Sequence, residues 1–165
     1  MTRSPLDKAN KAQQVMNNYD GRIERFKAVM GNQLPMTAAI VEVRPNVLIT
    51  YTKDTFPIQI LSKAGISLPP ALEKYDWRSW ALSREKLDEI NADVIFISTW
   101  QGSQQDNQAA RSALEKLTSD PLWLQLNAIQ QGRVYTVGDY IQGAGPLTAN
   151  LILDDLFRYL LPTKL

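Results

Sequence analysis

The chain has 165 residues, a length that suits one α/β domain built on a single core. It carries 18 Lys and Arg against 17 Asp and Glu, so no strong field would recruit nucleic acid or an anionic membrane. Cysteine and histidine are absent, which excludes disulfides, thiolate chemistry, His-based metal sites and triads that need an imidazole. We therefore predict a non-enzymatic protein with no cofactor, no protein metal site and no nucleic-acid partner.

The N-terminal segment predicts one long helix between Ser4 and Gly31. Ser4 is a favourable N-cap, Pro5 suits the first helical position, and Gly31 supplies the stop. Such a helix is roughly 39 Å long at 1.5 Å per residue, a length that suits either core packing or a bridge between two bodies. Its apolar stripe consists of Ala12, Val15, Met16, Tyr19, Ile23, Phe26, Val29 and Met30. We expect this stripe to fold back on the domain or to pair with a second copy, giving a homodimer.

The same segment argues against an export signal within the chain as given. Residues 1–18 contain no apolar run of the kind that forms a signal-peptide core. No other segment approaches the roughly 20 apolar residues that a transmembrane helix needs.

Strands and helices alternate through the rest of the chain. This order predicts a three-layer, doubly wound α/β fold with a mostly parallel sheet, so residues 32–165 form one domain after the helix of residues 1–31. The expected strands are 36–43, 47–51, 94–98 and 134–137, with a further stretch at 77–82. The expected helices are 56–64, 84–91 (capped by Ser83), 106–117, a short one from 121, and 146–161.

Aromatic and charged side chains gather in the loops that follow the expected strands. In a parallel sheet, ligands bind beyond the carboxyl ends of the strands, so these loops are the predicted ligand face. Loop aromatics can equally plug a domain surface, and that alternative stays open for each residue. The candidate ligand-binding residues in these loops are Tyr51, Lys53, Trp77, Trp80, Trp100 and Tyr140.

Three segments carry a resemblance to a known family. The longest is Asp120-Pro121-Leu122-Trp123-Leu124-Gln125-Leu126-Asn127-Ala128-Ile129-Gln130-Gln131-Gly132-Arg133-Val134-Tyr135. It resembles the D-P-x-W-x-x-L-x-A-V-x-x-G-R-V-Y stretch of the siderophore- and cobalamin-class solute-binding proteins of ABC importers. The segments 82–96 and 145–156 resemble the same family on either side of it.

The resemblance implies that the chain is the C-terminal lobe of such a protein, with residues 1–31 similar to the helix that connects the two lobes. Its loops would form half of a cleft that closes on a ferric siderophore or a similar chelate, bound weakly by one lobe alone. The implied partners are a first lobe and an ABC permease, in the periplasm or attached to the outer face of the membrane. The alternative is a stand-alone, non-catalytic interaction domain that has lost ligand binding.

Two acidic positions bear on this resemblance. Many relatives carry an arginine at the position of Glu42, whereas here Arg44 lies two residues on and shares its strand face. Arg44 is therefore the candidate anion-binding residue, with a structural ion pair to Glu42 as the alternative. The resemblance places Glu85 on the outer surface, facing arginines of the permease; a plain helix-terminus role is the alternative.

Overall fold

The computed structural model describes residues 4–161. Helix α1 (Pro5–Met30) begins as predicted, because the Ser4 hydroxyl accepts a hydrogen bond from the Leu6 amide at 3.4 Å. It ends at Gly31, whose φ of +52° favours glycine. None of the helices in this described range combines the length and the apolar character needed to cross a bilayer.

The domain is built on a six-stranded sheet whose strands are ordered β4-β2-β1-β5-β6, with β3 paired to β1. Strands β1, β5 and β6 are parallel, whereas β2 runs antiparallel between β1 and β4. The prediction of a mostly parallel sheet is therefore confirmed. The strands span Met36–Val43 (β1), Leu48–Tyr51 (β2), Ile66–Ser67 (β3), Ser79–Leu82 (β4), Val94–Thr99 (β5) and Val134–Thr136 (β6).

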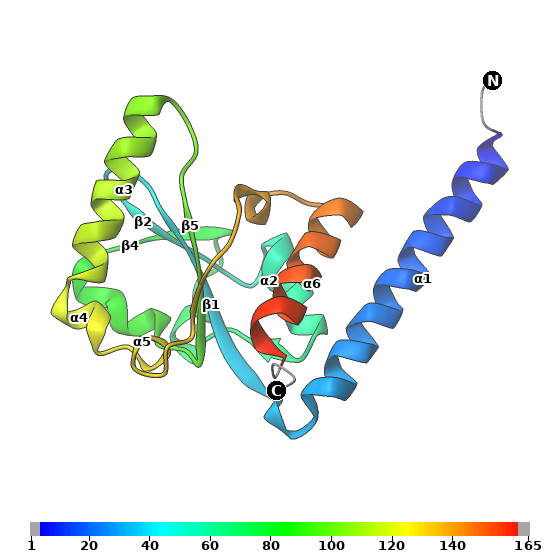
Figure 1. Ribbon diagram of the computed structural model, residues 1–165, viewed down its shortest axis with the longest axis horizontal. Coiled ribbons are helices and arrows are strands. Elements are labelled where there is room, and N and C mark those ends of the chain that lie inside the picture. The colour runs from blue at the N-terminus through cyan, green and yellow to red at the C-terminus, as the bar shows by residue number, and fades with distance from the viewer. Residues whose placement is uncertain (1–3, 162–165) are drawn as a thin grey trace.

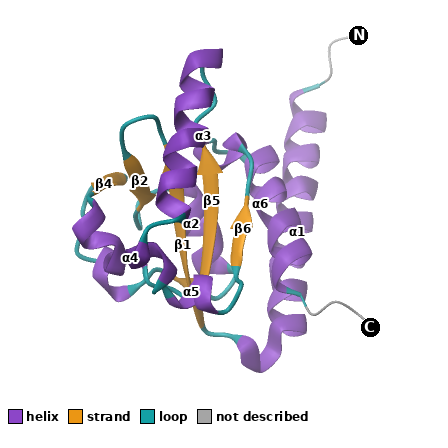
Figure 2. Cartoon of the chain, turned by 60° about the vertical axis from the view of Figure 1, so that its left-hand side comes forward, coloured by secondary structure: helices purple, strands orange, loops and turns teal. Residues whose placement is uncertain are grey.

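Helices cover both faces of this sheet, which confirms the three-layer arrangement (Figure 2). Helix α3 (Gln104–Thr118) covers one face, and the short helices α4 (Pro121–Leu124) and α5 (Asn127–Gln130) follow near its C-terminal end. Helices α2 (Phe56–Lys63) and α6 (Pro146–Leu160) cover the other face. Within residues 4–161 the remaining elements are four 3-10 turns: η1 (Gly31–Gln33), η2 (Pro70–Leu72), η3 (Arg84–Ile90) and η4 (Asp139–Gln142).

One local prediction is wrong. The segment expected as a helix capped by Ser83 is the 3-10 turn η3, and the Ser83 side chain makes no capping hydrogen bond. A 3-10 turn has poorer hydrogen-bond geometry than an α-helix, so packing holds this segment instead. Leu87 and Ile90 are buried, and η3 contacts both η2 and α4.

The two halves of α1 differ in their surroundings. The C-terminal half packs on α6 and buries four residues of the predicted stripe: Tyr19, Ile23, Phe26 and Met30. Arg22 adds polar contacts to α6, at 2.6 Å to Asn150 Oδ1 and 2.5 Å to Asp154 Oδ1. Figure 1 shows the N-terminal half running on past α6, and Ala12 and Met16 are exposed there. The stripe therefore folds back on the domain over about half its length.

Candidate functional site

The topology separates the predicted ligand loops into two groups. The turn after β1 and the loops after β5 and β6 lie at the carboxyl edge of the parallel strands. Because β2 is antiparallel, its last residue, Tyr51, lies opposite Ser79, the first residue of β4. The expectation that the predicted ligand loops all follow carboxyl ends at one edge is therefore wrong for the loops that carry Lys53 and Trp77.

A compact group of side chains nevertheless forms where β1 ends, and we call it the Arg44 cluster: Glu42, Arg44, Tyr51 and Trp100. Glu42 is fully buried and accepts hydrogen bonds from Arg44 Nε and, at 3.0 Å, from the Tyr51 hydroxyl. The Arg44 guanidinium lies over the Trp100 ring, 4.7 Å from its centroid. The Glu42 carboxylate thus joins Arg44, just after β1, to Tyr51 at the end of β2, and Arg44 in turn contacts Trp100 in the loop after β5.

Both Trp100 and Tyr140 are held close to backbone glycines. The Trp100 amide donates to the Val43 carbonyl at 2.8 Å, and a Cβ on Gly102 would lie 2.6 Å from the Trp100 ring nitrogen. A Cβ on Gly138 would lie 2.7 Å from the Tyr140 ring. Glycine at these two positions therefore lets each ring lie against its own loop.

The electrostatics of the cluster are set by burial. Burial, and then the nearby Glu42 carboxylate, raise the pKa of Tyr51 far above its ordinary value, so its hydroxyl stays a donor at physiological pH. Ser98 lies opposite Glu42 in the β1–β5 register, and its buried hydroxyl has no hydrogen-bond partner within residues 4–161. Sequence reasoning missed Ser98, because it follows a continuous apolar run at the end of an expected strand and nothing in the sequence marks its hydroxyl as unpaired.

A cavity of about 360 Å³ adjoins Tyr51. It lies between the start of α2, the start of β4 and the loop that follows Tyr140, and its walls include Arg78, Ser79 and Gln142. Arg78 is exposed and makes no ion pair in the described part of the chain. The cavity therefore offers one cation and several polar groups beside the Arg44 cluster. No group of three or more potential metal-ligating side chains occurs among residues 4–161.

Three of the predicted site residues lie apart from the Arg44 cluster: Trp80 on β4, Trp77 just before it, and Lys53 in the loop after β2. Trp80 stacks on Tyr75 with a centroid distance of 4.5 Å, and Lys53 Nζ lies 3.2 Å from Asp76 Oδ1. The Trp77 side chain is 70% exposed. For Trp80 the packing role is evident, since its ring covers a buried tyrosine, while Trp77 remains free to meet a ligand or a partner.

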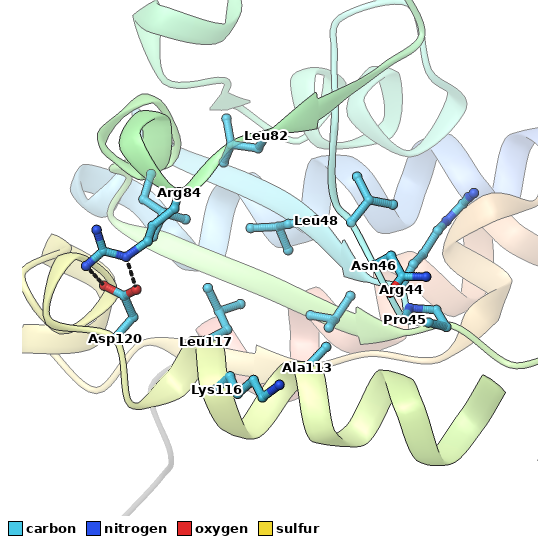
Figure 3. Close-up of a pocket in the computed structure, with 13 residues that line it drawn as sticks. Arg44, Pro45, Asn46, Leu48, Leu82, Arg84, Ala113, Lys116, Leu117 and Asp120 are labelled. Carbon is cyan, nitrogen blue, oxygen red and sulfur yellow. Dashed lines mark hydrogen bonds and ion pairs between the residues drawn. The ribbon is translucent and has the colours of Figure 1, made fainter. Parts of the chain in front are cut away.

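A second hollow lies on the opposite face of the sheet, between the turn after β1 and helix α3 (Figure 3). Its volume is about 320 Å³, and its floor is formed by leucines of β2, β4 and α3. Figure 3 shows Arg84 and Asp120 paired at one end, whereas the Arg44 side chain points out of the hollow. This hollow is lined by Arg44 but by none of the other three residues of the Arg44 cluster, so it is a separate feature from the site.

Glu85 lies in the first turn of η3 and is exposed. Its own backbone N–H, then the Ser83 hydroxyl, lower the pKa of the Glu85 carboxyl, and Arg84 acts in the same direction. The side chain is therefore a charged, accessible carboxylate at neutral pH, supported by local hydrogen bonds within the turn.

Comparison with known proteins places this chain in a family. A sequence profile described as Periplasmic binding protein matches residues 5–141, so the chain belongs to the periplasmic binding protein family. Among curated relatives, the Bacillus subtilis protein named probable siderophore-binding lipoprotein YfiY is 29% identical over 168 residues. The match covers 96% of this chain and 51% of that protein.

Other similar proteins also match most of this chain and only part of their own length. The achromobactin-binding periplasmic protein of Dickeya dadantii is 27% identical, over 89% of this chain and 49% of its own length. The chain thus spans about half the length of the curated relatives it matches. The crystal structure of Staphylococcus aureus SirA superimposes with a TM-score of 0.86 at 22% identity, covering 96% of this chain and 62% of SirA, which shows a shared fold.

Proposed function

We propose that the chain is the C-terminal lobe of a solute-binding protein that serves an ABC importer of iron chelates, in the periplasm or on the outer face of the membrane. Membership of the periplasmic binding protein family supports this role, as do relatives named for siderophore and achromobactin binding. SirA has been solved with staphyloferrin B, and FeuA of Bacillus subtilis with ferri-bacillibactin. In this proposal α1 is the connecting helix, and its exposed N-terminal half contacts the first lobe.

One observation carries the proposal. At the carboxyl edge of the sheet, the Arg44 guanidinium lies over Trp100 and next to a fully buried carboxylate, and Tyr51, which is bonded to this carboxylate, lines a cavity of about 360 Å³. Ligands of open α/β sheets bind at this edge. An aromatic face and a guanidinium offer stacking to the organic part of a chelate and paired hydrogen bonds to its oxygens. We assign Arg44, Tyr51, Trp100 and Tyr140 to the lobe's half of the cleft, with Lys53, Trp77 and Trp80 at its margin.

Calorimetric titration of the chain with ferric citrate and with a ferric tris-catecholate tests this function. One lobe buries only part of a ligand, so we expect dissociation constants no tighter than about the micromolar to millimolar range. Arg44→Ala should weaken binding about tenfold or more, because it removes charge-assisted hydrogen bonds. Lys116→Ala, which removes an exposed charge on α3, should leave binding unchanged. Equal loss in both variants would mean that net charge, and not this site, attracts the chelate.

The proposal extends to the permease through Glu85. An exposed carboxylate fixed by its own turn suits bidentate pairing with an arginine of a partner. Within a two-lobed binding protein that contains this lobe, Glu85→Gln should leave chelate affinity unchanged and weaken permease binding or transport. Glu115→Gln, an exposed glutamate on α3, is the matched control. Transport that is equal in both variants would reduce Glu85 to its local role in η3.

A stand-alone interaction domain is the second candidate, and one observation favours it. Arg44 is already paired with Glu42, and Lys53 with Asp76, so two of the predicted cations are partly neutralised. In that case the exposed half of α1 would meet a second copy of the chain. Light scattering at increasing concentration separates the two: a homodimer that binds no chelate supports the second candidate.

A further inference from the structure

The Arg44 guanidinium can make contacts through its Nε atom, its face and the edge formed by its two Nη atoms. The first two are already in use. The Nε atom donates to Glu42, and one face of the guanidinium covers the Trp100 ring. Neither Nη atom has a hydrogen-bond partner in the stretch from residue 4 to residue 161, and 39% of the side chain is exposed. What remains is the edge formed by the two Nη atoms, which is the edge that binds a carboxylate or two adjacent oxygens in parallel.

The buried Glu42 carboxylate orients this edge, because it accepts the hydrogen bond from Arg44 Nε. The Glu42 side chain is fully buried on the face of β1 opposite α3, because it alternates with Val43, which lines the α3 hollow. One carboxylate oxygen meets Arg44, and the other accepts from the Tyr51 hydroxyl at 3.0 Å. A buried carboxylate held at both oxygens is restrained, and through the Nε bond it restrains the orientation of the guanidinium.

The surrounding residues support the same geometry. The backbone amide of Trp100 donates a hydrogen bond to the Val43 carbonyl, which holds the Trp100 backbone at the end of β1, and the Trp100 ring contacts Arg44. The Ser98 hydroxyl, 2% exposed and without a partner among the described residues, faces the same layer as Glu42. Within residues 4–161 the Ser98 hydroxyl is therefore an unpaired hydrogen-bond donor on the same sheet face as the Glu42 carboxylate.

Resting on the proposed function, we infer that Glu42 is a positioning residue that aims the Nη edge of Arg44 at a ligand bearing paired anionic oxygens. The substrate class is a carboxylate-type or other bidentate oxygen chelate. Glu42 acts through Arg44 and does not touch the ligand. The negative charge of Glu42 weakens the long-range attraction of the site for anions. At short range, however, Glu42 gives the contact between the Arg44 Nη edge and the ligand a defined direction.

The competing explanation predicts the opposite change in anion affinity when Glu42 is replaced by glutamine. If Glu42 merely neutralises Arg44, then Glu42→Gln removes a repulsive charge and anions bind more tightly. If Glu42 positions Arg44, the same change weakens the Nε bond, lets the guanidinium turn, and anions bind less tightly. The isosteric substitution therefore separates positioning from neutralisation by direction, not by size.

The experiment uses the ¹⁵N-labelled chain, with citrate as the probe and chloride at equal ionic strength as the reference. In the wild type, the Arg44 Nε–H resonance, assigned with Arg44→Lys, should exchange slowly, unlike that of exposed Arg78, and should shift on citrate addition. Glu42→Gln should speed its exchange and weaken citrate binding at least tenfold. Tyr51→Phe, which frees one Glu42 oxygen while keeping the ring and the charge, should weaken citrate binding in the same direction.

Each outcome decides between the two ideas. Citrate binding that is unchanged or tighter in Glu42→Gln overturns the positioning role and leaves the proposed function in place. Should that variant fail to fold, unchanged citrate binding by Tyr51→Phe overturns it instead. An Arg44 resonance as fast in exchange as that of Arg78 in the wild type also overturns it. A wild-type chain that gives no citrate response beyond chloride overturns both this inference and the anion site of the proposed function.

Discussion

Replacing Phe26 by alanine tests whether α1 is part of the domain in solution. Phe26 lies on the half of α1 that faces α6, and its side chain is fully buried. Its ring meets that of Phe157 edge to face, with centroids 5.7 Å apart. The guanidinium of Arg22 lies 5.6 Å from the centroid of the same Phe157 ring. Phe26 is therefore the central apolar contact between the two helices.

The size of the effect follows from that burial. Truncating a buried phenylalanine to alanine costs about 3 to 5 kcal/mol, from lost transfer free energy and from the cavity left behind. An edge-to-face aromatic pair adds about 0.5 to 1.5 kcal/mol beyond area, so we expect the upper half of that range. For a chain of this size, about 4 to 5 kcal/mol corresponds to a fall in Tm of roughly 8 to 20 °C.

Urea unfolding followed by circular dichroism measures the change, with Val29→Ala as the control on the same helix. Val29 is 48% exposed, so its truncation should change the free energy of unfolding by less than about 0.5 kcal/mol. The slope of the transition should be alike in both variants if the whole domain unfolds together. A loss below about 1 kcal/mol for Phe26→Ala would show that α1 is not docked on α6 in solution.

Three further predictions concern buried polar groups and a tight loop. Burial raises the pKa of Asp155, so its stabilising contribution is complete below the ordinary value near 3.8 and is lost as pH rises through the raised value. Asp155→Asn should therefore stabilise the domain at pH 7 but not at pH 3.5, as urea unfolding at both pH values will show. Burial acts to raise the pKa of Glu89, but hydrogen bonds from Lys74 and Tyr75 outweigh it and lower that pKa. Tyr75→Phe removes a 2.5 Å bond to Glu89 and should cost about 1.5 to 3 kcal/mol at pH 7, a deficit that narrows as pH falls through the lowered pKa. Gly102→Ala should displace the Trp100 indole and shift its N–H resonance; an unmoved resonance would contradict the close approach in this loop.

Sequence reasoning succeeded where one local signal was enough. The ends of α1 were predictable because Ser4, Pro5 and Gly31 each act on the backbone next to them. Strand β5 was predictable because a continuous apolar run suits a strand covered on both faces. Family membership agrees with the resemblance drawn from residues 120–135, all of which fall within the matched region of residues 5–141.

It failed where strand direction and packing decide the outcome. Residues 47–51 read as a strand in either direction, and only pairing with both β1 and β4 makes β2 antiparallel. That direction removes the loop of Lys53 from the carboxyl edge. The 3-10 form of η3 likewise depends on contacts with η2 and α4, which lie outside the segment itself.

Glu42 shows how the two kinds of information combine. The sequence places a glutamate in an apolar strand two residues before an arginine, which leaves anion binding by Arg44 and an ion pair with Glu42 as alternatives. The structure confirms the pair and adds that the carboxylate is fully buried and held at its second oxygen by Tyr51. Burying a charge is costly unless it is paired and hydrogen-bonded, so this arrangement is poor evidence for stability alone. A costly carboxylate that leaves the outer edge of Arg44 unpaired, at the carboxyl edge of a sheet, is better explained by what that edge is positioned to bind.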